Sequence, residues 1–199
     1  MKNRILLLLF ACMVLAATGC PPKAPNGERS DIAEPTPFTE FEGVQLKKIA
    51  GEKLAVIRCE DYMAHISDNL SKLVHWMITS QAEVVGPNTT IFYSYPGNLR
   101  RDDLDNSLLY MVGFPVHGRT MGYGDVKIFD MRDYTAACIL HRGEYGNIGE
   151  SYNELLNWVS QNGYKRDGFF REIYISGPGP RDPVDPNLWI TEIQVKVKK

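Results

Sequence analysis

Two glutamates in the C-terminal third, Glu172 and Glu192, are the side chains whose spacing best suits joint chemistry. Each lies in a run of β-branched and aromatic residues that is typical of a strand. Because strand side chains alternate between faces, we expect Ile173 and Ile175 to pack beneath a helix. Glu172 and Tyr174 then point away from that helix, and Glu192 is expected on the same open face of the last strand.

A partly desolvated pair of carboxylates attracts a cation, and the π-faces of aromatic rings strengthen that attraction. The candidate rings are Tyr145, Trp158, Tyr174 and Phe92, which lie near strand edges or at a helix margin. Tyr145 follows a Gly-Glu turn, where a side chain can lean over a cleft. The alternative is that both acids are solvated on an exposed sheet face and that each ring belongs to the core.

The chain carries the same pattern twice, with an offset of 82 residues. Residues 56–97 and 138–179 share nine identities over 42 positions, Trp76/Trp158 among them. Chance would give roughly two or three. The seam between two such halves is a natural place for a ligand.

Each half reads as strand, helix, strand, strand. Apolar residues recur with helical spacing from Ile66 to Met77 and from Ile148 to Val159. The expected strands are residues 54–59, 90–95 and 108–116 in the first half and 134–140, 171–176 and 188–197 in the second. This order predicts an α+β fold with pseudo-twofold symmetry: an antiparallel sheet with helices on one face and a ligand cleft on the other.

The two acids are absent from the first half. Glu172 aligns with Thr90, and Glu192 aligns with Met111 or Val112, depending on a one-residue gap. A shared scaffold explains such an asymmetry poorly, which favours a role in function.

The N-terminus is typical of a bacterial lipoprotein signal over residues 1–20: Lys2 and Arg4, an apolar stretch, and small residues before Cys20, the expected lipidation site. An ordinary secretory peptide or a short membrane anchor is the alternative. Residues 21–42 are rich in proline and have the composition of a tether. Residues 43–199 form the expected domain, with repeats at about 44–118 and 124–199.

Composition excludes several classes of function. Without its signal the chain has a net charge of −4, so no basic surface for nucleic acid is expected. The four histidines lack metal-ligand spacing, and we predict no metal and no cofactor. Cys59 and Cys138 either form a disulfide or are two buried small hydrophobic residues. No Walker loop, Gly-x-Ser-x-Gly or His-Glu-x-x-His motif is present.

The segment His141–Tyr145 (HRGEY) resembles the HRGPY signature of GyrI-like small-molecule-binding domains. Segments 151–158, 171–174 and 191–195 follow in the order and spacing of that family, and the resemblance covers about residues 44–199. It implies a duplicated strand–helix–strand–strand domain that commonly binds effectors in transcription regulators of the AraC and MerR types. In that family a pocket glutamate, matching Glu192, meets cationic aromatic ligands. Glu172, Tyr145 and Trp158 resemble further pocket positions.

The resemblance also implies alternatives. Some members of the family hydrolyse electrophilic toxins with similar glutamates, which would make Glu172 and Glu192 catalytic. This chain shows no helix-turn-helix segment, so direct control of transcription is not expected. The related haem-binding SOUL domains would need an axial histidine, and we find no convincing one.

We therefore expect a membrane-tethered module that binds a small cationic or amphipathic aromatic ligand, and not an enzyme. The alternatives are a hydrolase and an envelope lipoprotein that binds another protein. The expected location is the bacterial cell envelope, at the periplasmic face of the outer membrane in a Gram-negative cell.

Overall fold

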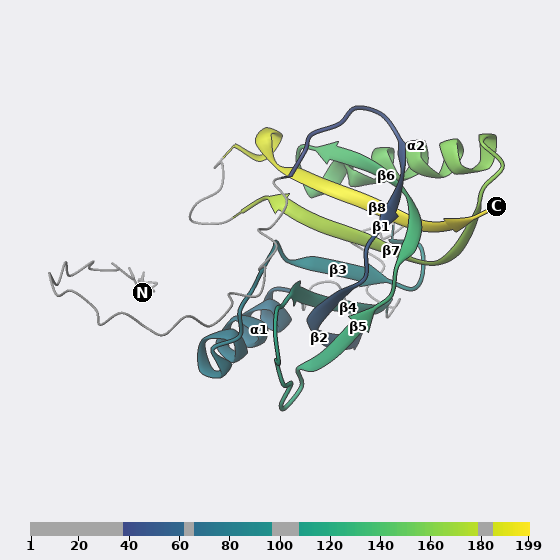
Figure 1. The fold of residues 1–199 in the computed structure, drawn as a ribbon. Coiled ribbons are helices and arrows are strands. Elements are labelled where there is room, and N and C mark those ends of the chain that lie inside the picture. The colour runs from purple at the N-terminus through teal and green to yellow at the C-terminus, as the bar shows by residue number, and fades with distance from the viewer. Residues whose placement is uncertain (1–37, 62–65, 97–107, 179–184) are drawn as a thin grey trace, which may run out of the picture. The chain divides into compact units, whose positions relative to one another are not determined.

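Eight strands form one curled antiparallel sheet in the order β1-β6-β8-β7-β3-β4-β2-β5, and two helices pack against it (Figure 1). The computed structural model describes residues 38–61, 66–96, 108–178 and 185–199, which belong to the unit Pro35–Lys199. The strands are β1 (Gln45–Ile49), β2 (Glu52–Asp61), β3 (Thr89–Phe92), β4 (Leu108–Pro115), β5 (Lys127–Met131), β6 (Tyr134–Arg142), β7 (Lys165–Ser176) and β8 (Ile190–Lys198). The helices are α1 (Ile66–Ser80) and α2 (Ile148–Gln161), with short 3-10 turns η3 (Tyr145–Asn147) and η4 (Pro186–Leu188). The α+β class is confirmed.

The expected unit occurs twice, as β2–α1–β3–β4 and as β6–α2–β7–β8. Three of the four equivalent pairs begin 82 residues apart, at residues 52 and 134 for the first strands, 66 and 148 for the helices, and 108 and 190 for the last strands. The exception is the pair β3 and β7, since β7 begins at residue 165 and is the longer strand.

Two short strands that the sequence did not predict hold the halves together. β1 precedes the first unit but pairs with β6 of the second, and β5 precedes the second unit but pairs with β2 of the first. They too start 82 residues apart. Each half thus donates its leading strand to the edge of the other.

The centre of the sheet is the pairing of β3 with β7, where the two halves meet. In that register Thr90 lies opposite Glu172, and these two residues occupy the same position in the two repeats. The pseudo-twofold axis therefore passes through this pair of residues. One side of the axis carries a carboxylate and the other a hydroxyl.

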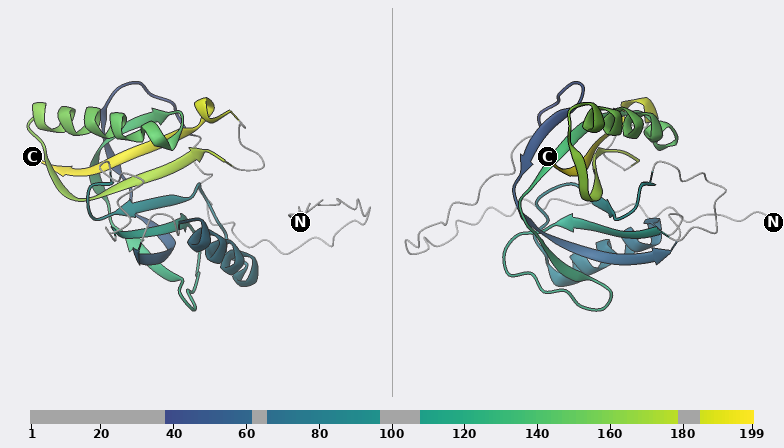
Figure 2. Two further views of the ribbon diagram at one scale, coloured as in Figure 1. Left: turned by 180° about the vertical axis from the view of Figure 1, so that it is seen from behind. Right: turned by 90° about the vertical axis from the view of Figure 1, so that its right-hand side faces the viewer.

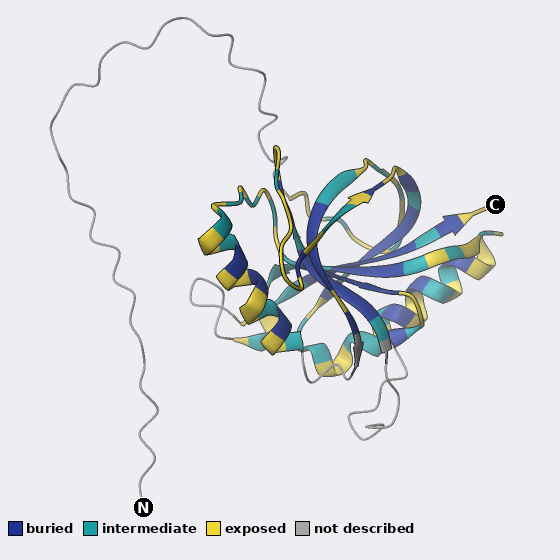
Figure 3. Cartoon of the chain, turned by 90° about the horizontal axis from the view of Figure 1, so that it is seen from below, coloured by how far each residue is buried: buried dark blue, intermediate teal, exposed yellow. Residues whose placement is uncertain are grey.

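Both helices pack on the same face of the sheet, called the helix face here. Figure 2 shows α2 lying over β6 and β8, and α1 lying over β2 and β4. Leu73 of α1 and Leu155 of α2 are fully buried against Ile57, Ile139 and Ile193 of the strands. Outer residues of both helices stay exposed, as Figure 3 shows in yellow.

The opposite face, called the far face here, is also buried. Leu54, Val56, Ile91, Met111 and Cys138 form a second core there, on which partly buried Phe41, Ile49, Phe129 and Phe169 pack. The sheet curls around these side chains. A ligand cleft was expected on this face, whereas the chain's own side chains fill its centre.

Cys59 and Cys138 are both free and buried. Cys59 packs in the core of the helix face and Cys138 in the core of the far face, so the sheet separates them. Of the two alternatives, the structure supports two buried hydrophobic residues.

The signal segment, Cys20 and residues 21–37 of the tether lie outside the described residues. Within the described residues, no helix is long and apolar enough to cross a bilayer.

Leu73 and Leu155 provide a test of the equivalence of the halves. Each is fully buried at the same position of its helix. Leu73→Ala and Leu155→Ala should each lower the free energy of unfolding by about 2–5 kcal/mol, through lost burial and a residual cavity. Urea unfolding measures the effect.

The matched control for Leu155→Ala is Glu154→Ala at the exposed neighbouring position, which should change the stability by about 0.5 kcal/mol or less. A large loss from one leucine variant and none from the other would contradict an equivalent packing of the two helices.

Candidate ligand-binding site

Glu172 lies in the middle of the sheet, on β7, with its carboxylate on the helix face. Its Oε1 accepts a hydrogen bond from the hydroxyl of Tyr152 of α2 at 2.7 Å, and its Oε2 accepts one from the hydroxyl of Tyr174 at 2.6 Å. Tyr174 Oη also lies 3.3 Å from Thr90 Oγ1. The side chain is buried, with 6% of the residue exposed.

This position corrects the strand parity expected from the sequence. Phe170 is part of the core of the helix face, and Glu172 and Tyr174 share its side of β7. Ile173 lies on the far face, paired with Glu192. Both faces of this sheet bury apolar side chains, so the alternation of isoleucines does not mark the helix face. Glu172 and Glu192 therefore lie on opposite faces.

The register resolves the alignment of Glu192. In β8 it lies beside Ile173, as Met111 lies beside Ile91 in the first half. Glu192 is thus the equivalent of Met111, with the one-residue gap. Glu172 is the equivalent of Thr90, as expected.

Burial raises the pKa of the Glu172 carboxyl, and the hydrogen bonds from Tyr174 and Tyr152 partly offset this rise. Burial also holds the pKa of both tyrosines well above 10, and the neighbouring carboxylate raises them further. The tyrosines therefore keep their protons and act as donors. None of the ion pairs among the described residues involves Glu172.

Aromatic rings surround this carboxylate. Tyr152 lies edge-on to Tyr95 and to Phe170, with centroid distances of 5.7 Å in both pairs. On the outer side, the Tyr145 ring lies 5.7 Å from that of Tyr174 and 5.1 Å from that of Trp189. A Cβ at Gly177 would come within 2.6 Å of the Tyr145 hydroxyl, so a larger residue there would displace this ring.

The structure brings together three of the predicted site residues, Glu172, Tyr174 and Tyr145. Phe92 is buried in β3 opposite Phe170 and packs beneath the cluster. Trp158 is not in the cluster, because its ring stacks on Tyr164 at 5.9 Å.

Three residues of the cluster were missed: Tyr95, Tyr152 and Trp189. Tyr152 stands in the apolar stripe of α2, so the sequence indicated a core residue. Only the fold reveals that its hydroxyl donates a hydrogen bond to Glu172, because this contact depends on the position of β7. The 3-10 turn η3 positions Tyr145, and Trp189 follows η4 just before β8.

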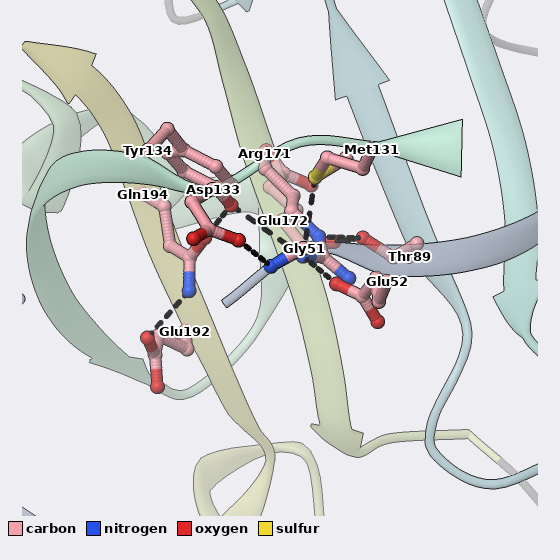
Figure 4. Close-up of polar contacts among 10 residues, drawn as sticks. All are labelled: Gly51, Glu52, Thr89, Met131, Asp133, Tyr134, Arg171, Glu172, Glu192 and Gln194. Atoms are coloured by element: carbon pink, nitrogen blue, oxygen red, sulfur yellow. Dashed lines mark hydrogen bonds and ion pairs between the residues drawn. The ribbon is translucent and has the colours of Figure 1, made fainter. Parts of the chain in front are cut away.

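Glu192 belongs to a different cluster, on the far face. Its Oε2 lies 3.2 Å from Lys47 Nζ, and its Oε1 accepts a hydrogen bond from Gln194 at 2.8 Å. Gln194 Oε1 in turn accepts one from the hydroxyl of Tyr134 at 2.5 Å. Figure 4 shows this chain of contacts from Glu192 towards Arg171.

Arg171 is the buried cation of that cluster. It forms an ion pair with Glu52 of β2, and its Nη1 lies 3.4 Å from the Tyr134 hydroxyl. Its Nε donates to Thr89 Oγ1 at 2.9 Å, and this hydroxyl donates to the backbone carbonyl of Glu172 at 2.7 Å. The far face thus pairs its charges within the protein and supports the backbone of β7 (Figure 4).

Two surface hollows, of about 490 and 370 Å³, lie at the β1 edge of the sheet. Neither is lined by Glu172 or Glu192. Among the described residues, no three side chains of His, Cys, Asp or Glu come together as a metal-binding group. On the helix face, the Glu172 carboxylate and the surrounding rings combine a negative charge with π-faces, and the protein's own side chains cover the carboxylate.

Burial of Glu172 should make the stability depend on pH. A carboxyl whose pKa is raised on folding stabilises the protein fully below its unfolded value, here 4.5, and this contribution is lost as the pH rises through the folded pKa. Glu172→Gln should therefore gain stability relative to the wild type between pH 4.5 and pH 8, measured by thermal unfolding over that range. Glu154→Gln on the exposed side of α2 is the control, and parallel curves for the wild type and Glu172→Gln would contradict the assignment.

The chain is similar to the C-terminal domain of EcmrR, with a TM-score of 0.68 and 20% identity over 80% of this chain and 99% of that domain. It is also similar to EcmrR in a DNA complex, with a TM-score of 0.67 and 22% identity, covering 78% of this chain and 57% of the EcmrR chain. This chain thus spans little more than half the length of that regulator.

Two further solved structures share the fold. A hydrolase encoded by lin2189 from Listeria innocua has a TM-score of 0.54 and 12% identity, over 79% of this chain and 92% of that one. SAV2435 bound to tetraphenylphosphonium has a TM-score of 0.52 and 14% identity, over 78% and 93%. No curated protein matches the sequence. The profile of the GyrI-like small molecule binding domain matches residues 42–198, so the chain belongs to the GyrI-like family of small-molecule-binding domains.

Proposed function

We propose that this domain binds a lipophilic aromatic cation on its helix face, with Glu172 as the counter-charge. The observation that carries the proposal is a buried carboxylate that has aromatic neighbours and takes part in none of the ion pairs among the described residues. A carboxylate in such a place is costly unless it is paired. The two tyrosine hydroxyls supply hydrogen bonds to the carboxylate, and a bound cation would supply the opposite charge.

The two hydroxyls also bear on the kind of ligand. Both oxygens of Glu172 already accept a hydrogen bond. A ligand therefore needs charge and apolar surface more than it needs its own N–H donors. Quaternary and delocalised cations with aromatic substituents have this chemistry, and rings such as Tyr152 and Tyr174 add cation–π attraction.

Entry requires side chains to move, because the carboxylate is covered. Tyr145 and Trp189 are partly exposed and lie on the outer side of the cluster. Tyr145 is the first residue of η3 and Trp189 directly follows η4, so neither belongs to a central strand. In the proposal these two rings move aside and then stack on the bound ligand.

From the sequence, Glu192 was expected to be the main counter-charge and Glu172 to assist it, whereas the proposal gives the main role to Glu172. Glu192 is paired with Lys47 and lies on the far face. Its carboxylate is thus already neutralised by the protein, which supports a role in holding the sheet together.

Tetraphenylphosphonium and the isosteric anion tetraphenylborate provide the test. Titration calorimetry should show binding of the cation to the wild type and none of the anion. Glu172→Gln should weaken binding of the cation about 10-fold or more, since it removes a desolvated opposite charge. Glu192→Gln is the matched control and should stay within about threefold of the wild type. Equal binding by Glu172→Gln, with loss in Glu192→Gln, would overturn the assignment.

A hydrolase is the second candidate, favoured by one observation: a buried carboxyl with a raised pKa beside two hydroxyls can hold or accept a proton during a reaction. Mass spectrometry of an alkylating electrophile after incubation distinguishes the two functions. Several turnovers per protein, lost in Glu172→Gln, would establish hydrolysis. If neither cations nor electrophiles engage the wild type, the result favours the third candidate, a protein-binding lipoprotein of the envelope.

The proposal includes tethering of the domain to a bacterial membrane through Cys20. It is supported by the basic, apolar and small-residue pattern of residues 1–20 and by the proline-rich segment that follows. A lipid on Cys20 would keep the binding domain outside the cytoplasm, at the periplasmic face of the outer membrane in a Gram-negative cell.

Cys20→Ala should move the protein from the membrane fraction to the soluble fraction of the envelope and abolish labelling by a fatty-acid analogue. Cys12→Ala is the matched control, because Cys12 lies within the apolar stretch. Unchanged membrane association in Cys20→Ala would contradict the lipid anchor.

A further inference from the structure

The hydroxyl of Thr191, in β8, is buried and unpaired. The residue is 1% exposed, and its Oγ1 has no hydrogen-bond partner among the described residues. An unpaired buried hydroxyl lowers stability. A ligand that offers a hydrogen-bond partner would remove this cost.

Thr191 lies beside the proposed site. It pairs with Tyr174 of β7 on one side and with His141 of β6 on the other. Glu172 pairs with Ile193, two residues further along β8, so Thr191 is the diagonal neighbour of Glu172 on the helix face. Diagonal neighbours are separated by roughly 7–8 Å.

The neighbours of Thr191 use their polar atoms elsewhere. The hydroxyl of Tyr174 donates to Glu172, and the two ring nitrogens of His141 lie 3.0 Å from Ser151 Oγ and 3.0 Å from the carbonyl oxygen of Glu144. These contacts position the site: Ser151 is on α2, and Glu144 directly precedes Tyr145. They leave the Thr191 hydroxyl, on the same face of the sheet as Glu172, without a hydrogen-bond partner in the part of the chain that the structure describes.

The first half differs at the equivalent position. With the one-residue gap of the last strand, the equivalent of Thr191 is Tyr110, whose ring is fully buried against Phe92 and whose hydroxyl accepts a hydrogen bond from Asn69 Nδ2 at 3.5 Å. The second half thus has a short side chain with an unpartnered hydroxyl among the described residues, where the first half has a ring with a bonded one. Thr191 and Glu172 both lie on the helix face of adjacent strands.

We infer that the Thr191 hydroxyl is a second anchoring point of the ligand site and selects among cations. This inference rests on the proposed function and adds to it the class of ligand. The preferred ligands are aromatic cations that carry a hydroxyl, amide or carbonyl group a few ångströms from the charged centre. Glu172 neutralises the charge, and Thr191 exchanges a hydrogen bond with the polar group.

Tetraphenylphosphonium and two analogues that carry one hydroxyl, (3-hydroxyphenyl)- and (4-hydroxyphenyl)triphenylphosphonium, test the inference on the full domain. The wild type should bind at least one hydroxylated cation about 5-fold more tightly than the parent cation. Thr191→Val keeps the shape and removes the hydroxyl. In this variant the ratio of the affinities for the hydroxylated and the parent cation should fall to about one.

Stability provides a second readout. Thr191→Val should raise the Tm of the unliganded protein by about 2–4 °C, because it removes an unpaired hydroxyl. The matched control is Thr89→Val, since Thr89 is equally buried but its hydroxyl is bonded to Arg171 and Glu172. That variant should lower the Tm.

The outcomes separate this inference from the proposed function. If the wild type binds none of the three cations, the proposed function fails. If it binds all three equally, or if Thr191→Val keeps the preference, only the role of Thr191 is overturned. A lower Tm for Thr191→Val would show a paired hydroxyl and would also overturn it.

Discussion

The proposed site depends on one interaction, the hydrogen bonds that two tyrosine hydroxyls donate to the buried Glu172 carboxylate. One donor, Tyr152, comes from α2 and the other, Tyr174, from the same strand as the acid. The distance between helix and sheet therefore sets the geometry of the site. The buried residues Leu155 and Val159 hold α2 at that distance, so ordinary hydrophobic packing positions a polar group.

The far face shows why the helix face is distinctive. Arg171 and Glu172 are neighbours in the chain, yet their side chains lie on opposite sides of the sheet. The guanidinium is paired with Glu52, and Glu192 is paired with Lys47, so the far face neutralises its own charges. On the helix face, the described partners of the Glu172 carboxylate are hydroxyl groups and not cations. Thr89 joins the two sides, because its hydroxyl contacts both Arg171 and the backbone of Glu172.

Much of the fold could be predicted from the sequence, because helical periodicity and the 82-residue repeat are strong signals. β1 and β5 could not, since each has only five residues and gains its partner from the other half. The parity of β7 was misjudged because burial on both faces removes the contrast that alternation needs. Glu172, Tyr174 and Tyr145, which the sequence named as site residues, lie together in the fold, and their part in binding stays a prediction. Tyr152 could not be distinguished from a core residue before its distance to Glu172 was known.

The register of β3 against β7 has a consequence for how this site could arise. Two identical units joined by the same antiparallel pairing would carry one residue type on both sides of the axis. A glutamate there would put two like charges directly opposite each other, with Cβ atoms roughly 5 Å apart, which is destabilising. A symmetric homodimer would carry this repulsion or would have to keep one of the two carboxyls protonated. Joining the units in one polypeptide, with Thr90 facing Glu172, removes the conflict, so a covalent duplication allows a single carboxylate at the axis.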